Sequence, residues 1–227
     1  MIFCITVCVA MLIVSGVALI DNLETVMSQS TTRSSIPDTE PFSAVNSNNW
    51  ALILVNRENP LPKNYMPQLT ELANGQRVDA RILPDLQAMF DDMRNTGVYP
   101  QVTDGYRSTG EQQQILEDKI QEYKAQGYGS AQAKKLAEQW VAVPGTSEHQ
   151  LGLALDINPD DSGRSSGEEV YAWLCKNAHQ YGFILRYPAN KTQITGIIYE
   201  PWHFRYVGRS AAQEIYARDI CLEEYLK

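Results

Sequence analysis

One long uncharged segment begins the sequence: Met1–Ile20 carries no charged side chain, and 17 of these residues are apolar. At about 1.5 Å per residue, a helix of 20 residues reaches about 30 Å, the thickness of the hydrocarbon core of a bilayer. Every charge behind the net charge of −8 therefore follows this segment. This distribution excludes a protein with several membrane spans, and it predicts one water-soluble domain with a sizeable core after residue 20.

The apolar segment predicts export. No Lys or Arg precedes it, which is unusual for a signal peptide, but the first basic residue after it is only Arg33. Because no basic cytoplasmic flank follows the segment, the positive-inside rule places residues 21–227 outside the cytoplasm. Small residues at 16–18 would permit cleavage, so a removed signal peptide and a retained membrane anchor are both open. A buried core helix is the alternative to both.

Residues 21–49 are predicted to be a flexible stalk, and residues 50–227 the folded domain. Positions 21–44 hold nine Ser or Thr residues and two prolines, with few large apolar side chains. Such a stretch buries too little apolar surface to offset the entropy of ordering it. The acidic net charge argues against a nucleic-acid partner, which would need a basic face.

The pattern of the domain predicts an α+β fold, with a small antiparallel sheet and helices packed around it. Apolar runs predict strands at 51–55, 102–107, 151–157 and 203–207, and a hairpin formed by 183–187 and 194–199. Periodicity and capping boxes at Ser108/Glu111 and Ser165/Glu168 predict helices at 79–97, 108–126, 130–140, 165–181 and 210–226. Connections between the strands are too short for regular βαβ units.

Two of the four cysteines, Cys175 and Cys221, fall in the domain at apolar helical positions. Free buried thiols and a disulfide are both open for this pair. No Cys-x-x-Cys pair occurs, so a thiolate zinc site is excluded.

Histidine is rare, and two of the three histidines lie close to carboxylates in the sequence. His149 precedes Asp156 by seven residues. In a straight strand the two would point to opposite faces, and in a straight helix they would be about 10.5 Å apart along the axis. They can bind one ion only if the chain bends between them, and Gly152 permits a bend. His179 has no carboxylate nearby and is predicted to be a surface residue.

The second group is Tyr199-Glu200-Pro-Trp-His203. Imidazole and carboxylate are good zinc ligands, and three protein ligands with one open position are typical of catalytic zinc. His149, Asp156 and His203 supply such a set, and Glu200 could then act as a general base. On these residues alone, ordinary hydrogen-bonding roles for both histidines are equally open.

Taken together, the motifs resemble those of the zinc D-alanyl-D-alanine carboxypeptidases of the VanY type. This type belongs to a wider family of peptidoglycan metallopeptidases with VanX-like and lysostaphin-like enzymes. The likeness covers about residues 50–226. It rests on Ser147-x-His149-x-x-Gly152-x-Ala154-x-Asp156, Glu200-Pro-Trp-His203, Gly105-Tyr-Arg107-Ser108, the stretches 181–188 and 195–208, and the domain entrance at 54–62.

For the metal, the resemblance implies that His149, Asp156 and His203 bind Zn²⁺ and that Glu200 is the catalytic base. A small sheet would then carry the zinc site.

For the substrate, it implies that Arg107 binds the scissile carbonyl or the developing oxyanion, a charge-assisted role. Ser147 and Gln112 are candidate substrate-binding residues. The alternatives are a local turn hydrogen bond for Ser147 and a solvated helix face for Gln112.

The resemblance implies an enzyme that removes the C-terminal D-alanine from peptidoglycan stem peptides. With the export predicted from residues 1–20, we expect a monomer that is membrane-anchored or secreted to the cell wall. Two alternatives are an L,D-carboxypeptidase acting on tetrapeptide stems and a non-catalytic wall-binding module. A role in glycopeptide resistance and a role in wall maturation are both open. Residues 117–140 match no motif of the family and are interpreted as a helical arm that affects substrate access.

Overall fold

The computed structural model describes residues 50–227. The predicted apolar segment 1–20 and stalk 21–49 lie outside the described residues. Within residues 50–227, no helix is long and apolar enough to span a bilayer.

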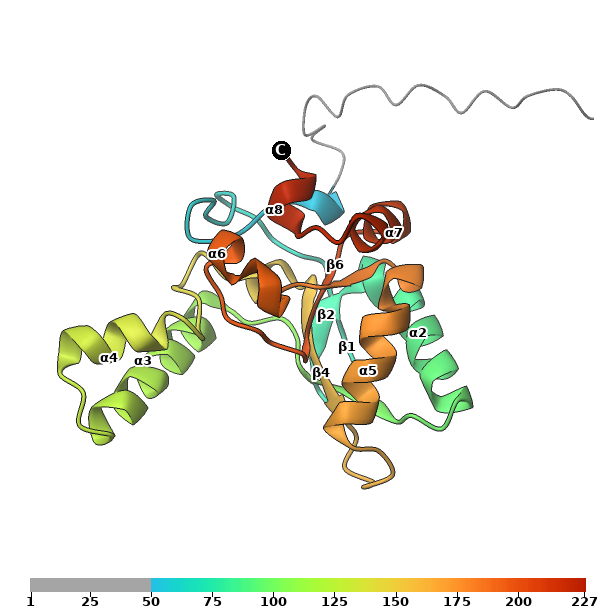
Figure 1. Cartoon of the computed structure of the whole chain (residues 1–227), viewed down its shortest axis with the longest axis horizontal. Helices are drawn as coiled ribbons and strands as arrows, with labels where there is room; N and C mark the ends of the chain where they lie inside the picture. Colours follow the sequence, from blue (N-terminus) through green and yellow to red (C-terminus); the bar gives the residue numbers. More distant parts are fainter. Residues whose placement is uncertain (1–49) are drawn as a thin grey trace, which may run out of the picture. The chain divides into compact units, whose positions relative to one another are not determined.

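The domain combines two antiparallel sheets with seven α-helices in its described part, which confirms the predicted α+β class (Figure 1). The strands are β1 (Leu69–Glu71), β2 (Arg77–Asp79), β3 (Pro100–Asp104), β4 (Ala154–Pro159), β5 (Phe183–Leu185) and β6 (His203–Tyr206). The helices are α2 (Leu83–Asn95), α3 (Thr109–Ala125), α4 (Ser130–Ala137), α5 (Gly167–Asn177), α6 (Thr192–Thr195), α7 (Arg209–Arg218) and α8 (Leu222–Tyr225). The larger sheet has the strand order β3-β4-β6-β5, and β1 pairs with β2.

The main core lies where α2 and α5 pack against the larger sheet (Figure 1). Met89 and Met93 of α2 are fully buried, as are Leu155 and Ile157 of β4 and Phe204 of β6. Along β4 and β6, these buried apolar residues alternate with polar residues. One face of the sheet therefore packs against the core, and the opposite face presents the polar side chains.

The first predicted capping box is confirmed, and the second is shifted by one residue. Ser108 Oγ accepts from the backbone N–H of Glu111, whose carboxylate accepts from the N–H of Ser108. At α5 the box is formed by Ser166 and Glu169. Ser165 is not the cap because its Oγ accepts from the Tyr99 N–H at 2.9 Å.

Three predicted elements are wrong. Residues 51–55 form no strand, because Trp50–Leu52 is a 3₁₀ turn followed by irregular chain, and the carbonyl oxygens of Ala51 and Ile53 accept from Arg205. Residues 194–199 contain the end of α6, and β5 pairs instead with β6, with Phe183 opposite Tyr206. The last predicted helix is broken into α7 and α8 at Asp219, which has φ +50°.

Candidate metal centre

Three predicted ligands meet at the larger sheet. One ligand atom from each of His149, Asp156 and His203 lies within 4.8 Å of the others. Asp156 Oδ1 lies 3.2 Å from His203 Nδ1 and 3.6 Å from His149 Nε2. The two imidazole rings are perpendicular, with centroids 4.9 Å apart. All three side chains therefore converge on one point.

Strand pairing and one glycine bring them together. Asp156 on β4 is the direct cross-strand partner of His203 on β6. His149 lies in the 3₁₀ helix η3 (Glu148–Leu151), which Gly152 ends in the left-handed conformation, with φ +72°. A Cβ atom at Gly152 would lie 3.0 Å from the backbone nitrogen of Asp79. The bend predicted at Gly152 is thus confirmed.

His149 is oriented by a second glycine. Its Nδ1 lies 2.7 Å from the carbonyl oxygen of Gly105, so Nδ1 donates and Nε2 keeps its lone pair toward Asp156. A Cβ atom at Gly105 would lie 2.3 Å from the carbonyl oxygen of Arg77. Only glycine lets the chain pass at this distance.

The ionisation states of the cluster's side chains, and its buried oxygen without a hydrogen-bond donor in the described residues, are suited to binding a cation. Burial opposes the ionisation of Asp156, but His149 and His203 outweigh it and hold the pKa of this carboxyl below its usual range. Burial also lowers the pKa of His203, which keeps the imidazole neutral and able to ligate. Asp156 Oδ1 is buried and has no hydrogen-bond donor within residues 50–227. Two imidazoles and one carboxylate suit zinc, and three ligands leave one coordination position open.

Glu200 lies beside the ligand cluster, with Oε2 3.6 Å from His203 Nδ1. Burial and the charge of Asp156 together raise the pKa of Glu200 to about 8, against the opposing effect of Arg107. A carboxyl whose pKa lies close to neutral can both accept and return a proton near pH 7. This is the property of a general acid–base residue.

Arg107 is held from two sides. Its Nε and Nη2 lie 3.0 and 2.9 Å from Asp104 Oδ2, and Nη2 lies 3.6 Å from Asp156 Oδ2. Its Nη1 donates to the side-chain oxygen of Gln112, whose amide nitrogen donates to the Ala142 carbonyl at 2.7 Å. Gln112 is fully buried, so both polar ends of this predicted substrate-binding side chain are used within the protein.

A cavity of about 370 Å³ opens over the cluster. Ser147 lines it, and its side chain does not cap η3, which leaves the hydroxyl available. His179 lies outside the cavity, stacked on Tyr216. Eight further lining residues were not singled out from the sequence: Ile115, Lys119, Trp140, Val141, Ala142, Glu148, Tyr187 and Ile197. Their positions depend on long-range folding, and no local pattern distinguishes them.

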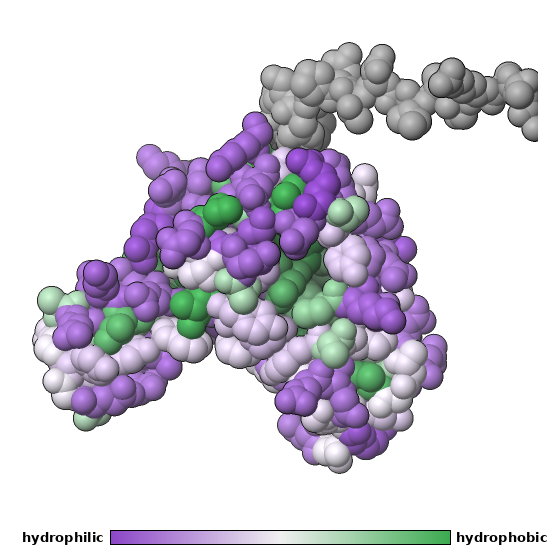
Figure 2. Space-filling view, viewed as in Figure 1, coloured by the Kyte–Doolittle hydropathy of each residue, from purple (hydrophilic) through white to green (hydrophobic). Residues whose placement is uncertain are grey.

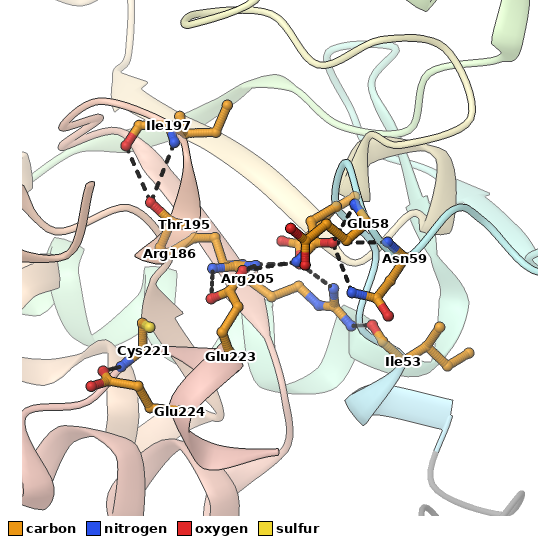
Figure 3. Close-up of polar contacts among 12 residues, drawn as sticks. Ile53, Glu58, Asn59, Arg186, Thr195, Ile197, Arg205, Cys221, Glu223 and Glu224 are labelled. Carbon is orange, nitrogen blue, oxygen red and sulfur yellow. Dashed lines mark hydrogen bonds and ion pairs between the residues drawn. The ribbon is translucent and has the colours of Figure 1, made fainter. Parts of the chain in front are cut away.

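A buried charge network supports the loop that carries His149. Arg186 donates from Nε to Glu148 Oε1 at 2.9 Å. It also binds both carboxylate oxygens of Glu223, at 2.6 and 2.9 Å (Figure 3). Arg205, two residues after His203, lies 2.9 Å from Glu148 Oε1. Both arginines and Glu148 are essentially unexposed. Burial opposes the ionisation of Glu148, but both arginines outweigh it and lower the pKa of this carboxyl.

An α+β domain with this set of ligands, a buried glutamate and a fixed arginine in one cavity defines a metal-dependent hydrolase. Residues 75–209 match the family model of VanY, described as D-alanyl-D-alanine carboxypeptidase. The chain belongs to this family, and it is a metallocarboxypeptidase.

One curated relative and two solved structures support this assignment. A D-alanyl-D-alanine carboxypeptidase of Enterococcus faecalis is 60% identical over 177 residues, which cover 78% of this chain and 66% of that protein. The chain thus spans about two thirds of the length of that relative. The solved structure of VanYB in complex with D-alanine-D-alanine is 60% identical, covers 78% of this chain and 97% of that chain, and has a TM-score of 0.76.

The third is a solved structure of a variant of the vancomycin-resistance D,D-pentapeptidase VanY from a VanB-type cassette, in complex with Zn(II). It is 60% identical, covers 78% of this chain and 99% of that chain, and has a TM-score of 0.77.

Proposed function

We propose that this chain is a zinc-dependent D-alanyl-D-alanine carboxypeptidase that removes the C-terminal D-alanine from peptidoglycan stem peptides. The observation that carries the proposal is the convergence of three ligand atoms, Glu200 and Arg107 on one cavity. The D-alanine-D-alanine complex of the VanYB relative and the zinc complex of the VanY variant support the substrate class and the metal.

Each residue of the centre has a distinct role in this proposal. His149 Nε2, Asp156 Oδ1 and His203 Nδ1 would hold the metal. Zinc, when bound, acts as a Lewis acid and lowers the pKa of water. Glu200 takes the proton of the attacking water and passes it to the amine of the leaving D-alanine.

Arg107 stabilises the negative charge that develops on the scissile carbonyl oxygen. Asp104 fixes its guanidinium group before substrate arrives, so little reorganisation is needed during the reaction. The Ser147 hydroxyl contacts the substrate. Gln112 acts through Arg107, because its side-chain oxygen accepts from the guanidinium group.

Mass spectrometry of the products from tetrapeptide and pentapeptide stems tests this function. We expect the purified domain 45–227 to contain about one zinc and to release one D-alanine from the pentapeptide. Trimming of the tetrapeptide instead would favour an L,D-carboxypeptidase. Binding of both peptides without turnover would favour a wall-binding module and would refute the proposal.

We also propose that the domain works outside the cytoplasm as a monomer, with 1–20 as signal peptide or anchor and 21–49 as stalk. The support is the uncharged apolar character of residues 1–20 and the absence of a basic residue before Arg33. Protease added to intact cells should cleave a retained protein in the stalk, and a cleaved form should be found in the wall or the medium. Recovery of the whole chain from the cytoplasm would contradict the proposal.

A further inference from the structure

Helices α3 and α4 form an antiparallel arm that stands out from the rest of the domain (Figure 1). The arm has a small core of its own, in which Leu116, Ala137 and Val141 are buried and Ile120 and Tyr123 pack against them. Because its two helices hold each other through this core, the arm has a defined inner face.

The arm is connected to the metal centre at its base, both where the chain enters the arm and where it leaves it. At its base, Gln112 bridges Arg107 and the carbonyl of Ala142. Gln150, the residue after His149, donates to Thr109 Oγ1 at 2.9 Å and accepts from the Gly145 N–H at 2.7 Å. The position of the arm relative to the reacting groups is therefore fixed by hydrogen bonds.

The inner face of the arm, defined here as Ile115, Lys119 and Trp140, lines the same cavity as the metal ligands. Trp140 is 39% exposed, and the Lys119 ammonium group lies 6.0 Å from the centroid of its ring. Hydrophilic residues and a few apolar residues are mixed on the visible surface of the arm (Figure 2). An exposed tryptophan at the edge of a catalytic cavity offers a large contact area to a ligand.

The cavity is larger than one D-alanine needs, since about 300 Å³ already accommodates a drug-sized ligand. Its lining includes two cations, Arg107 and Lys119. Arg107 is already paired with Asp104. Lys119 lies 2.7 Å from Glu122, a half-exposed carboxylate one turn along α3. Such surface pairs contribute at most about 1 kcal/mol, so Lys119 can exchange this partner for a ligand carboxylate.

We propose that the inner face of the arm binds the part of the stem peptide that precedes the scissile D-alanyl-D-alanine. Lys119 pairs with a carboxylate of this part, while Trp140 and Ile115 pack on its aliphatic atoms. This inference rests on the proposed function and adds to it a second contact region, which makes the enzyme selective for long, acidic peptides over a bare dipeptide unit.

Steady-state kinetics with three substrates test it: N-acetyl-D-alanyl-D-alanine, a stem pentapeptide with a free carboxylate on its second residue, and the same pentapeptide with that carboxylate amidated. For Lys119→Ala we expect KM for the acidic pentapeptide to rise relative to the wild-type value. This rise should be about fivefold to tenfold larger than the rise in KM for the acetylated dipeptide. For the amidated pentapeptide, Lys119→Ala should raise KM no more than it does for the acetylated dipeptide. Lys119→Glu should reverse the preference between the two pentapeptides.

Trp140→Ala should weaken both pentapeptides alike, because packing does not depend on the carboxylate. Lys124→Ala is the matched control, since Lys124 lies on α3 but does not line the cavity. Equal effects of Lys119→Ala on all three substrates, or effects no larger than those of the control, would overturn the inference.

Failure of the proposed function gives a different result. If the wild-type protein releases no D-alanine from any substrate, the proposed function is wrong. Equilibrium binding of the acidic pentapeptide by calorimetry then decides the inference. Unchanged affinity in both Lys119 variants would refute it, and a selective loss would support it.

Discussion

Asp156 and His203 are direct partners across two antiparallel strands, and Asp156 Oδ1 lies 3.2 Å from His203 Nδ1. Two of the three candidate ligands are therefore set by the register of the sheet. A slip of one residue would turn one of the two side chains to the opposite face. The third ligand, His149, is set by the turn at Gly152. The metal position is thus built into the backbone before any ion binds.

Substitutions separate the ligand from the base. His203→Ala removes a ligand, so we expect zinc affinity to collapse. Glu200→Gln keeps the shape but removes the proton acceptor, so zinc should stay while turnover falls about 10²-fold or more. Metal content and turnover are measured on the same preparations, with His179→Ala as the control outside the site. An active Glu200→Gln protein, or one that loses zinc as readily as His203→Ala, would refute the role of Glu200.

Arg107→Ala should leave zinc in place and lower kcat/KM by about 10²–10³-fold, the size expected for a lost oxyanion donor. Arg107→Lys should restore only part of the activity, because an ammonium group cannot bind Asp104 and Gln112 with a planar fork. Loss of zinc from Arg107→Ala would instead assign Arg107 to the structure of the metal centre.

Gly105→Ala tests the orientation of His149. The added methyl group would lie 2.3 Å from the Arg77 carbonyl oxygen, so the backbone must move, and with it the acceptor of His149 Nδ1. Loss of such an orienting partner lowers metal affinity by about 10–100-fold. Competition with a zinc chelator measures this change. Gly110→Ala is the control, because a Cβ atom there meets nothing within 4 Å. Equal zinc affinity in both variants would contradict the prediction.

Glu148→Gln should destabilise the metal-free domain by about 3–5 kcal/mol, because it leaves buried arginine charge without a counter-charge. Glu117→Gln, at an exposed position of α3, should change stability little. Urea denaturation measures both. A loss as small as that of the control would show that the buried arginines find other partners.

The same network predicts an acid transition. The pKa of Glu148 in the folded protein is lower than its ordinary value of 4.5, so its contribution is complete above that pH. The contribution is lost as the pH falls below about 4.5 and through the lowered pKa of the folded state. We expect the unfolding free energy of the wild-type protein to fall in this range, and to fall less steeply in Glu148→Gln. Equal slopes would contradict the assignment.

Local features are predictable from the sequence itself, and the convergence of His149, Asp156 and His203 is predictable through the family resemblance, but the other long-range contacts are not. The bend at Gly152 and the cap at Ser108 depend on neighbouring residues, and both were predicted correctly. The apolar run 51–55 looks like a strand, but an apolar run does not reveal whether a pairing partner exists.

The charge network was invisible for a related reason. Arg186 binds Glu148 and Glu223, which lie 38 and 37 residues away in the sequence, and all three side chains belong to types that are usually exposed. Lys119 and Trp140 likewise enter the cavity only because the arm folds back on itself.

The link from Glu223 through Arg186 to Glu148 also has a practical consequence. Helix α8 is mechanically coupled to the residue that precedes His149, although it contributes nothing to the cavity. A truncation that removes α8 would take the counter-charge of Glu223 away from Arg186, the residue that also binds Glu148 next to His149. The last helix of the chain, which lies outside the cavity, therefore belongs to the support of the metal centre, and a shortened protein has to keep it.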